Sequence, residues 1–511
     1  MGHSCRRSVI LMNAVINMLS IEEVPRIRQF SGGRSGRFVA LLFGSVAVAV
    51  LTGTIAHVFD EMAALLLLSL LLLLAVFIGN FRYGILIPVV LLPLGSTTLI
   101  PREMFGVTGF NPLNGALLLS VLSLCLIWMV QPGRLSFPKW SGQFWVYVAM
   151  MVLGAFHGAM HVQAIPEYFR VLQVIKFDSI GGYLQDTFFK QMLILVTAFV
   201  FAIAVRNAHR PAGCLVSIFA STLVLPVAVI SIVAMSGESL ASLASSDSRA
   251  FLSVVGMHAN ELGLLFNMML ALSLFCFIGV SGAREKWALG LISLVLTVAI
   301  ALTFSRGAYL GFLVVVMFLQ FTQRRFRTTA LISLVGVVGA MLMPDAMIDR
   351  AFSGLEHGNA DDISAGRVTG IWRPLIEDIV SSPIIGSGRS SILWSEAARE
   401  QRILPVGHPH SAYIAAVLDY GLLGVVIIIS FFWHMWRVFK TMAELSIEPI
   451  WRGFFRGAMA CILLLLVQGL TDDIFTPSST QPFLWLAYGA TVGLISRVNA
   501  QTKGASFAVQ T

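Results

Sequence analysis

Residues 213–235 read GCLVSIFASTLVLPVAVISIVAM, a run of 23 residues without a charged side chain. A helix needs about 20 mainly apolar residues to cross a bilayer, so this run is long enough to span one. Similar runs recur along the whole chain of 511 residues, which is 57% hydrophobic and only 12% charged. Soluble domains carry about 25% charged residues. The sequence therefore predicts an all-α polytopic membrane protein and excludes a soluble globular enzyme.

Fourteen apolar runs are candidate transmembrane helices. Several are shorter than the ~20 residues that a span needs, so twelve spans are an alternative. In chain order the runs are Phe38–His57, Met62–Ile78, Ile85–Ile100, Leu113–Val130, Phe144–Met160, Met192–Val205, Gly213–Met235, Glu261–Val280, Trp287–Thr303, Ala308–Phe321, Thr329–Pro344, Ala412–Trp436, Phe454–Leu470 and Thr480–Ser496.

The charges between these runs predict the orientation. With the N-terminus inside, 22 of the 34 Lys and Arg residues lie in inner segments, and 21 of the 26 acidic residues lie outside. Half of the 12 outer cations lie in one long loop, and long loops do not decide orientation. We therefore expect both termini in the cytoplasm, and we read the net charge of +8 as a topology signal that implies no nucleic-acid partner.

The domain organisation follows from the same pattern. We expect a cytoplasmic tail (1–37), a transmembrane bundle (38–344), one long helical outer loop (345–411), the rest of the bundle (412–496) and a second cytoplasmic tail (497–511). Arg6 and Arg7 precede a short apolar run that faintly resembles a signal peptide, but acidic residues follow it and no cleavage pattern does, so a tail is predicted.

Three arginines are expected on the outer side, where fixed charge is costly and points to function. Arg249 precedes the span that begins at Glu261, Arg306 lies in a tight turn between two apolar runs, and Arg367 follows Gly366 in the long loop. A guanidinium stays charged and presents a planar fork of donors, which suits phosphate oxygens. Three of them would suit a diphosphate; each could instead be an interfacial anchor or the partner of a carboxylate.

His410 ends the long loop in the sequence Gly407-His408-Pro409-His410-Ser411, directly before a span. A histidine there titrates near neutral pH and can act as a general base. It could equally be a capping or packed residue, and His408 could be the working or the supporting histidine.

A metal site is not predicted. The outer side has no D-x-D or E-x-D pattern, and the pairs Asp361-Asp362 and Asp472-Asp473 are adjacent residues that would face different ways on a helix. Metal-independent chemistry without a cofactor is therefore expected.

At these residues the chain resembles the O-antigen ligase and polymerase superfamily of bacterial membrane glycosyltransferases. The most specific match is His410-Ser411, nine residues, then Gly421-Leu422-Leu423-Gly424, which fits the family's His, Asn/Ser/Gln, nine residues, Gly-x-x-Gly. Arg367 with Trp372 and the stretch 383–388 resemble the loop upstream, and the segments around Arg306 and Asn260 match too. The resemblance covers about residues 249–437.

The resemblance implies a GT-C-like enzyme of the bacterial inner membrane that works on the periplasmic face. Its donor would be an undecaprenyl-diphosphate-linked glycan, and its acceptor lipid A-core or a growing glycan chain. Arg249, Arg306 and Arg367 would bind the diphosphate and His410 would deprotonate the acceptor. Supporting residues would be His408, Ser411, Asn260, Gly421, Gly424 and Asp473.

Two other classes remain as alternatives. A lipid-linked glycan flippase also has about fourteen spans, but it commonly consists of two related halves, and the halves of this chain look unlike. A structural subunit of a polysaccharide complex would not depend on His410. Within the enzyme class, ligase is slightly favoured over polymerase because the His410 motif is complete.

Overall fold

The computed structural model describes residues 81–101, 103–104, 107–108, 111–130, 133, 135–237, 242, 252, 255–323, 361, 364, 366–471 and 474–508. Regular structure in these ranges is helical, apart from two antiparallel strands of two residues each, Glu103–Met104 (β1) and Val107–Thr108 (β2). The α-helices are α4 (Phe81–Leu91), α5 (Pro112–Val130), α6 (Gly142–Ala159), α7 (Tyr168–Val171), α8 (Ile180–Leu184), α9 (Lys190–Asn207), α10 (Leu215–Met235), α12 (Ala259–Gly279), α13 (Ala283–Ala301), α14 (Arg306–Gln323), α18 (Ile376–Ser381), α19 (Glu396–Arg399), α20 (Ala412–Leu445), α21 (Pro449–Gln468) and α22 (Pro482–Ala508).

Six helical segments in this part of the chain are long and apolar enough to cross a membrane. They are Pro112–Val130, Ile180–Asn207, Pro211–Met235, Ala259–Gly279, Ala412–Leu445 and Pro449–Gln468, and two shorter apolar helical segments are Gly84–Leu94 and Arg306–Thr322. The predicted all-α, multi-pass class is confirmed. Each predicted span that falls on described residues overlaps a helix. The expected spans at 38–57, 62–78 and 329–344 lie outside those residues, so the total number stays a prediction.

Helix α12 forms the centre of the bundle, and every residue from Leu262 to Cys276 is buried. A helix that is apolar on all sides is stable only when other helices surround it, and α10, α13, α14, α21 and α22 all contact α12. Helix α21 packs closest. A Cβ atom added to Gly453 would lie 2.5 Å from the carbonyl oxygen of Phe275, and one added to Gly457 would lie 2.7 Å from that of Ala271. These two glycines, four residues apart, let the two backbones approach directly.

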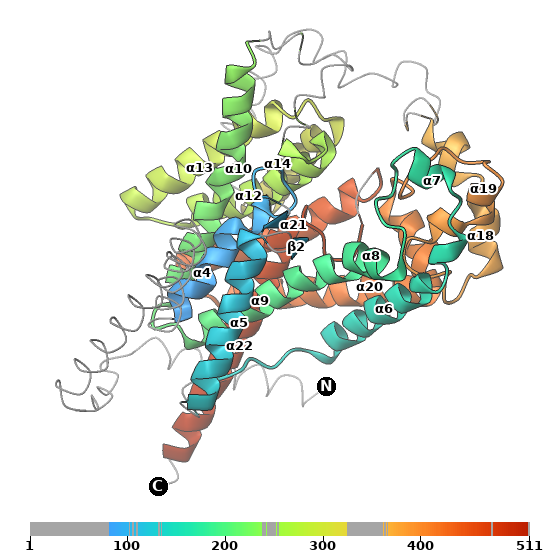
Figure 1. Cartoon of the computed structure of the whole chain (residues 1–511). Coiled ribbons are helices and arrows are strands. Elements are labelled where there is room, and N and C mark those ends of the chain that lie inside the picture. The colour runs from blue at the N-terminus through green and yellow to red at the C-terminus, as the bar shows by residue number, and fades with distance from the viewer. Residues whose placement is uncertain are drawn as a thin grey trace, which may run out of the picture.

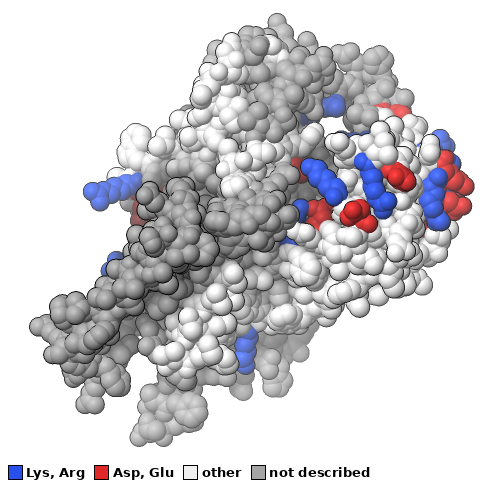
Figure 2. All heavy atoms as spheres, in the orientation of Figure 1, with Lys and Arg blue, Asp and Glu red and all other residues white. Residues whose placement is uncertain are grey.

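A separate lobe is formed by the short helices α7, α18 and α19. Figure 1 shows α7, α18 and α19 gathered at one end of the molecule, away from the long helices α5, α9 and α10. Its own apolar cluster includes Phe169, Tyr183, Leu375 and Trp394, so residues 159–183 pack against the described part of the long loop. Figure 2 shows charged side chains concentrated on this lobe. Arg402 of the long loop pairs with Glu377 and Glu400.

We predict that Gly457→Ala destabilises the protein, because the new methyl group would press on the backbone of α12 rather than on a movable side chain. Overpacking of this kind costs about 1–3 kcal/mol. Gly213→Ala is the matched control, since its Cβ would meet no atom within 4 Å. Melting temperatures in detergent should fall for Gly457→Ala only; equal melting of the two variants would contradict close packing of α12 on α21.

Candidate functional site

Arg306 is the first residue of α14, directly after a sharp turn. Phe304 in this turn has a positive φ of 50°. The Ser305 hydroxyl donates to Asn260 Oδ1 over 2.6 Å and accepts from the backbone N–H of Ala308 over 3.3 Å. Ser305 therefore satisfies one of the free N–H groups at the start of α14 and ties this start to the first turn of α12. Arg306 is half-buried where the two helix N-termini meet.

The end of α21 connects three segments that are far apart in sequence. We call residues 468–471 the 468–471 turn. Gln468 Nε2 donates to the Gly307 carbonyl over 2.7 Å, and the backbone N–H of Ala412 donates to the Gly469 carbonyl over 2.8 Å. The Arg367 guanidinium donates to the Thr471 carbonyl. The turn thus holds the start of α14 beside Arg306, the start of α20 beside His410, and the side chain of Arg367.

The two histidines lie in a segment that is fixed at Pro409. Trp372 Nε1 donates to the Pro409 carbonyl over 2.8 Å. His410 has a positive φ of 53°, and its backbone N–H donates to His408 Nδ1 over 3.1 Å. The ring centroids are 4.2 Å apart. Because the backbone conformation at His410 is an unusual one for a residue with a side chain, surrounding contacts must hold it there.

The hydrogen bond from the His410 N–H to His408 Nδ1 determines the tautomer of neutral His408. A ring nitrogen that accepts a hydrogen bond carries no proton, so the proton of the neutral ring lies on Nε2. Neutral His408 is therefore a donor at Nε2 and has no free lone pair there for taking a proton. Of the two histidines, His410 remains the better candidate for a general base.

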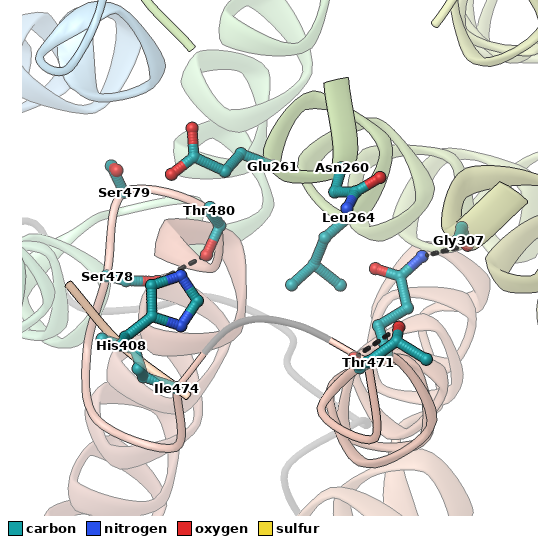
Figure 3. A pocket seen from close by; sticks show the side chains of 11 residues that line it. Asn260, Glu261, Leu264, Gly307, His408, Thr471, Ile474, Ser478, Ser479 and Thr480 are labelled. Carbon is teal, nitrogen blue, oxygen red and sulfur yellow. Dashed lines mark hydrogen bonds between the residues drawn. The ribbon is translucent and has the colours of Figure 1, made fainter. Parts of the chain in front are cut away.

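A cavity opens between the starts of α12 and α14, the histidine segment and the chain that follows α21. Figure 3 shows Asn260 and Gly307 on one side of it, Ser478, Thr480 and His408 on the other, and Leu264 between them. The lining residues are Asn260, Glu261, Leu264, Gly307, His408, Gln468, Thr471, Ile474, Ser478, Ser479 and Thr480. The lining is rich in hydroxyl and amide groups, and Glu261 accepts from the backbone N–H of His258 in a capping box at the start of α12.

The structure places the predicted site residues in different surroundings. The 468–471 turn brings Arg306, Arg367 and His410 to one region, and His408 and Asn260 line the cavity itself. Ser411 is the N-cap of α20 and accepts from the Ile414 N–H, which is a structural role. Arg249 and Asp473 lie outside the described residues.

Gly421 and Gly424 are placed where a side chain would not fit. Gly421 interrupts α20 with φ 63° and ψ −170°, and a Cβ atom there would lie 2.3 Å from the backbone of Ile384. The interruption frees N–H and carbonyl groups of α20, which pair with residues 383–388: Leu422 N–H donates to the Pro383 carbonyl and Gly388 N–H to the Asp419 carbonyl. Gly421 therefore lets residues 383–388 attach to α20, whereas a Cβ atom at Gly424 would lie 2.1 Å from the Cβ atom of Tyr420.

Sequence reasoning missed Arg389, which is 8% exposed and links this loop to the chain after α21. Its guanidinium donates to Thr476 Oγ1 over 2.7 Å and to the Tyr420 hydroxyl over 3.4 Å. Burial lowers the pKa of Arg389, but Tyr420 and Asp419 beside it raise it. The net effect is a raised pKa, so the guanidinium stays charged. The sequence signal for this position is the pair Gly386 and Gly388 just before it. Both glycines have a positive φ in the structure.

Of the two acidic pairs, Asp361 is the residue that lies within the described part of the chain. Asp361 accepts hydrogen bonds from the N–H of Thr369 over 3.0 Å and from its hydroxyl over 2.5 Å, which supports the helical turn after Arg367. Asp362, Asp472 and Asp473 lie outside the described residues. Within those residues, no group of three or more His, Cys, Asp or Glu side chains could hold a metal ion.

One region of the chain, which contains most of these residues, is similar to a known protein family. Residues 291–429 match the family described as O-antigen ligase. This match confirms the resemblance drawn from the motifs, and it includes Arg306, Arg367, His410 and both motif glycines. It ends before the 468–471 turn. A comparison with curated proteins gives no match.

We predict that Trp372→Phe loosens the histidine segment, because phenylalanine keeps an aromatic ring but cannot donate to the Pro409 carbonyl. Trp394→Phe is the matched control, since Trp394 Nε1 has no hydrogen-bond partner among the described residues. Carbethoxylation of His408 and His410, followed by mass spectrometry, should become several-fold faster in Trp372→Phe alone. Unchanged rates would show that other contacts hold the segment.

Proposed function

We propose that this chain is a metal-independent membrane glycosyltransferase of the O-antigen ligase type, which transfers a glycan from undecaprenyl diphosphate to a hydroxyl of lipid A-core. The match of residues 291–429 to O-antigen ligase carries the proposal and supports a ligase- or polymerase-type role. The common attachment of Gly307 beside Arg306, of Arg367 and of the start of α20 to the 468–471 turn supports a single site built from Arg306, Arg367 and His410.

The chemistry of the proposed reaction fits these groups. A lipid diphosphate is a good leaving group, so the enzyme must stabilise the developing negative charge, position the acceptor and remove one proton. Arg306 and Arg367, with Arg249, would bind the diphosphate oxygens, and His410 would take the acceptor proton. Neutral His408, a donor at Nε2, would support the site by hydrogen bonding. No step requires a metal ion.

The proposed location is the bacterial inner membrane, with both termini in the cytoplasm and the site on the periplasmic face. The distribution of Lys and Arg in the short loops supports this orientation. The charged lobe around α18 and α19 would then face the periplasm together with the cavity. A growing glycan is the alternative acceptor, and it would make the protein a polymerase of O-antigen or exopolysaccharide repeat units.

Deletion of the chain from its native bacterium tests the function and separates the two acceptors. We expect lipid A-core to lose all long glycan chains while the lipid-linked polymer accumulates. Chains of a single repeat unit on lipid A-core would instead indicate a polymerase. Surface glycans identical to those of the parent strain, with no lipid-linked intermediate accumulating, would contradict both assignments.

The defects of Arg306→Lys and His410→Ala should differ in kind. Lysine keeps the charge but loses the planar fork, so Arg306→Lys should weaken donor binding and lower transfer about 30- to 1000-fold. His410→Ala removes the base, so transfer should fall about 10²- to 10⁴-fold with donor binding nearly unchanged. Donor binding and transfer are measured in nanodiscs.

Two matched controls accompany these variants. Arg373→Lys changes an exposed arginine of the outer loop and His209→Ala an exposed histidine outside the site, and both should behave as wild type. A fully active His410→Ala together with an inactive His408→Ala would assign the base to His408. Full activity of both histidine variants would eliminate the general-base mechanism.

A further inference from the structure

Gln468 is a buried amide in the wall of the cavity. It is the last residue of α21, is 5% exposed and lines the cavity. Its Nε2 donates to the Gly307 carbonyl over 2.7 Å. Its Oε1 is buried and has no hydrogen-bond partner among the described residues. One half of the amide is thus fixed on the backbone beside Arg306, and the other half is an unused acceptor.

An unsatisfied buried acceptor is unusual in a folded protein and calls for an explanation. The amide cannot turn over to hide its oxygen, because Nε2 would then lose the Gly307 carbonyl and two oxygens would face each other. The apolar residues of the lining, Leu264 and Ile474, have no side-chain donor. Because Gln468 lines the cavity, a molecule that enters the cavity can supply the missing donor.

The chemistry of an amide oxygen limits what that molecule can be. It accepts from O–H or N–H groups and has nothing to offer a phosphate, whose oxygens are themselves acceptors. A cavity rich in hydroxyl and amide groups suits a polyhydroxylated ligand. We propose that Gln468 Oε1 accepts a hydrogen bond from a sugar hydroxyl of the glycan substrate. This inference rests on the proposed function and names Gln468 as a binding residue for the sugar.

The position of Gln468 favours the donor's first sugar over the acceptor. Gln468 is bonded to the residue next to Arg306, which we propose as a diphosphate ligand. A sugar attached to the diphosphate would lie directly beside that arginine. Both sources offer the same hydroxyl chemistry, so the experiment must distinguish them.

Asn267 on α12 provides a matched control. Its Nδ2 donates to the carbonyls of Gly263 and Ala308, each over 2.8 Å, so it holds the residue after Gly307 in the same way. Its Oδ1 is likewise buried without a partner in the described part of the chain. Asn267 is fully buried and is not part of the cavity lining. A variant at Asn267 therefore tests the effect of holding α14 without touching a ligand.

The experiment compares binding of two lipids to purified protein in nanodiscs, namely undecaprenyl diphosphate alone and the same lipid carrying the native glycan. Wild type should bind the glycan-bearing lipid more tightly. Gln468→Met should reduce this preference about five- to tenfold, the effect expected for one lost hydrogen bond. Asn267→Leu should weaken both lipids by the same factor and keep the preference.

The remaining outcomes separate the possible failures. If the donor preference is unchanged but Gln468→Met raises the KM for the acceptor five- to tenfold, the hydroxyl belongs to the acceptor and the sugar contact stands. If neither changes, Gln468 Oε1 meets only water and the inference is overturned. If wild type binds neither lipid and transfers no glycan, the proposed function itself fails.

If Gln468→Met does not fold, the substrate is changed instead of the protein. Wild type is then assayed with donors and acceptors whose sugars lack one hydroxyl at a time. Loss of one particular hydroxyl on either substrate should weaken its binding about five- to tenfold. Equal binding of all the deoxy compounds would overturn the inference.

Discussion

The hydrogen bonds at the end of α21 are the constraint on which the candidate site depends. The carbonyls of Leu465, Val467 and Gln468 at the end of α21 accept hydrogen bonds from backbone N–H groups of the turn itself, so the carbonyls of the turn are left to pair with other segments. In the 468–471 turn, the Gly469 carbonyl accepts from the first backbone N–H of α20 and the Thr471 carbonyl accepts from the Arg367 guanidinium. The Gln468 side chain donates to the Gly307 carbonyl at the start of α14. Segments from three parts of the chain are therefore placed by hydrogen bonds to the 468–471 turn.

The chain that follows this turn is held at a second point. Arg389 donates to Thr476, so the cavity wall that includes Ile474 is attached to the outer lobe on both sides, through Arg367 at Thr471 and Arg389 at Thr476. Arg389 in turn is fixed because its own N–H donates to the Gly154 carbonyl of α6. The helix break at Gly421 makes this arrangement possible, since it provides the backbone groups on which residues 383–388 pair.

The sequence predicted the helices well because apolar runs of span length have few other solutions. It also selected Arg306, Arg367 and His410, since an arginine in a tight outer turn and a histidine at a loop–span junction stand out from their surroundings. Gln468 could not be found in this way. It closes an apolar run like any polar residue at a helix end, and its partner Gly307 is 161 residues away. Arg389 resembled the other cations of the outer loop, because its burial depends on Tyr420 and Asp419 of another segment. Ser411 and Gly421 were predicted as supporting residues, and the structure shows capping and backbone roles for them.

The rigid pairing of α12 with α21 explains how distant groups can keep a common geometry. Because Gly453 and Gly457 place the two backbones in direct contact, close packing of α21 on α12 supports the position of the 468–471 turn. That start carries Asn260, which is bonded to Ser305 in the turn before Arg306. Helix α14 is therefore fixed from both sides, by α12 through Ser305 and by α21 through Gly307. A site whose charged groups are supported by packed helices requires little reorganisation when charge develops, which is the property that catalysis by fixed electrostatics needs. The long loop contributes Arg367 and the histidines. Arg367 contacts the same turn through its side chain, and Ala412, two residues after His410, contacts it through its backbone N–H, so this part of the loop is positioned by the bundle.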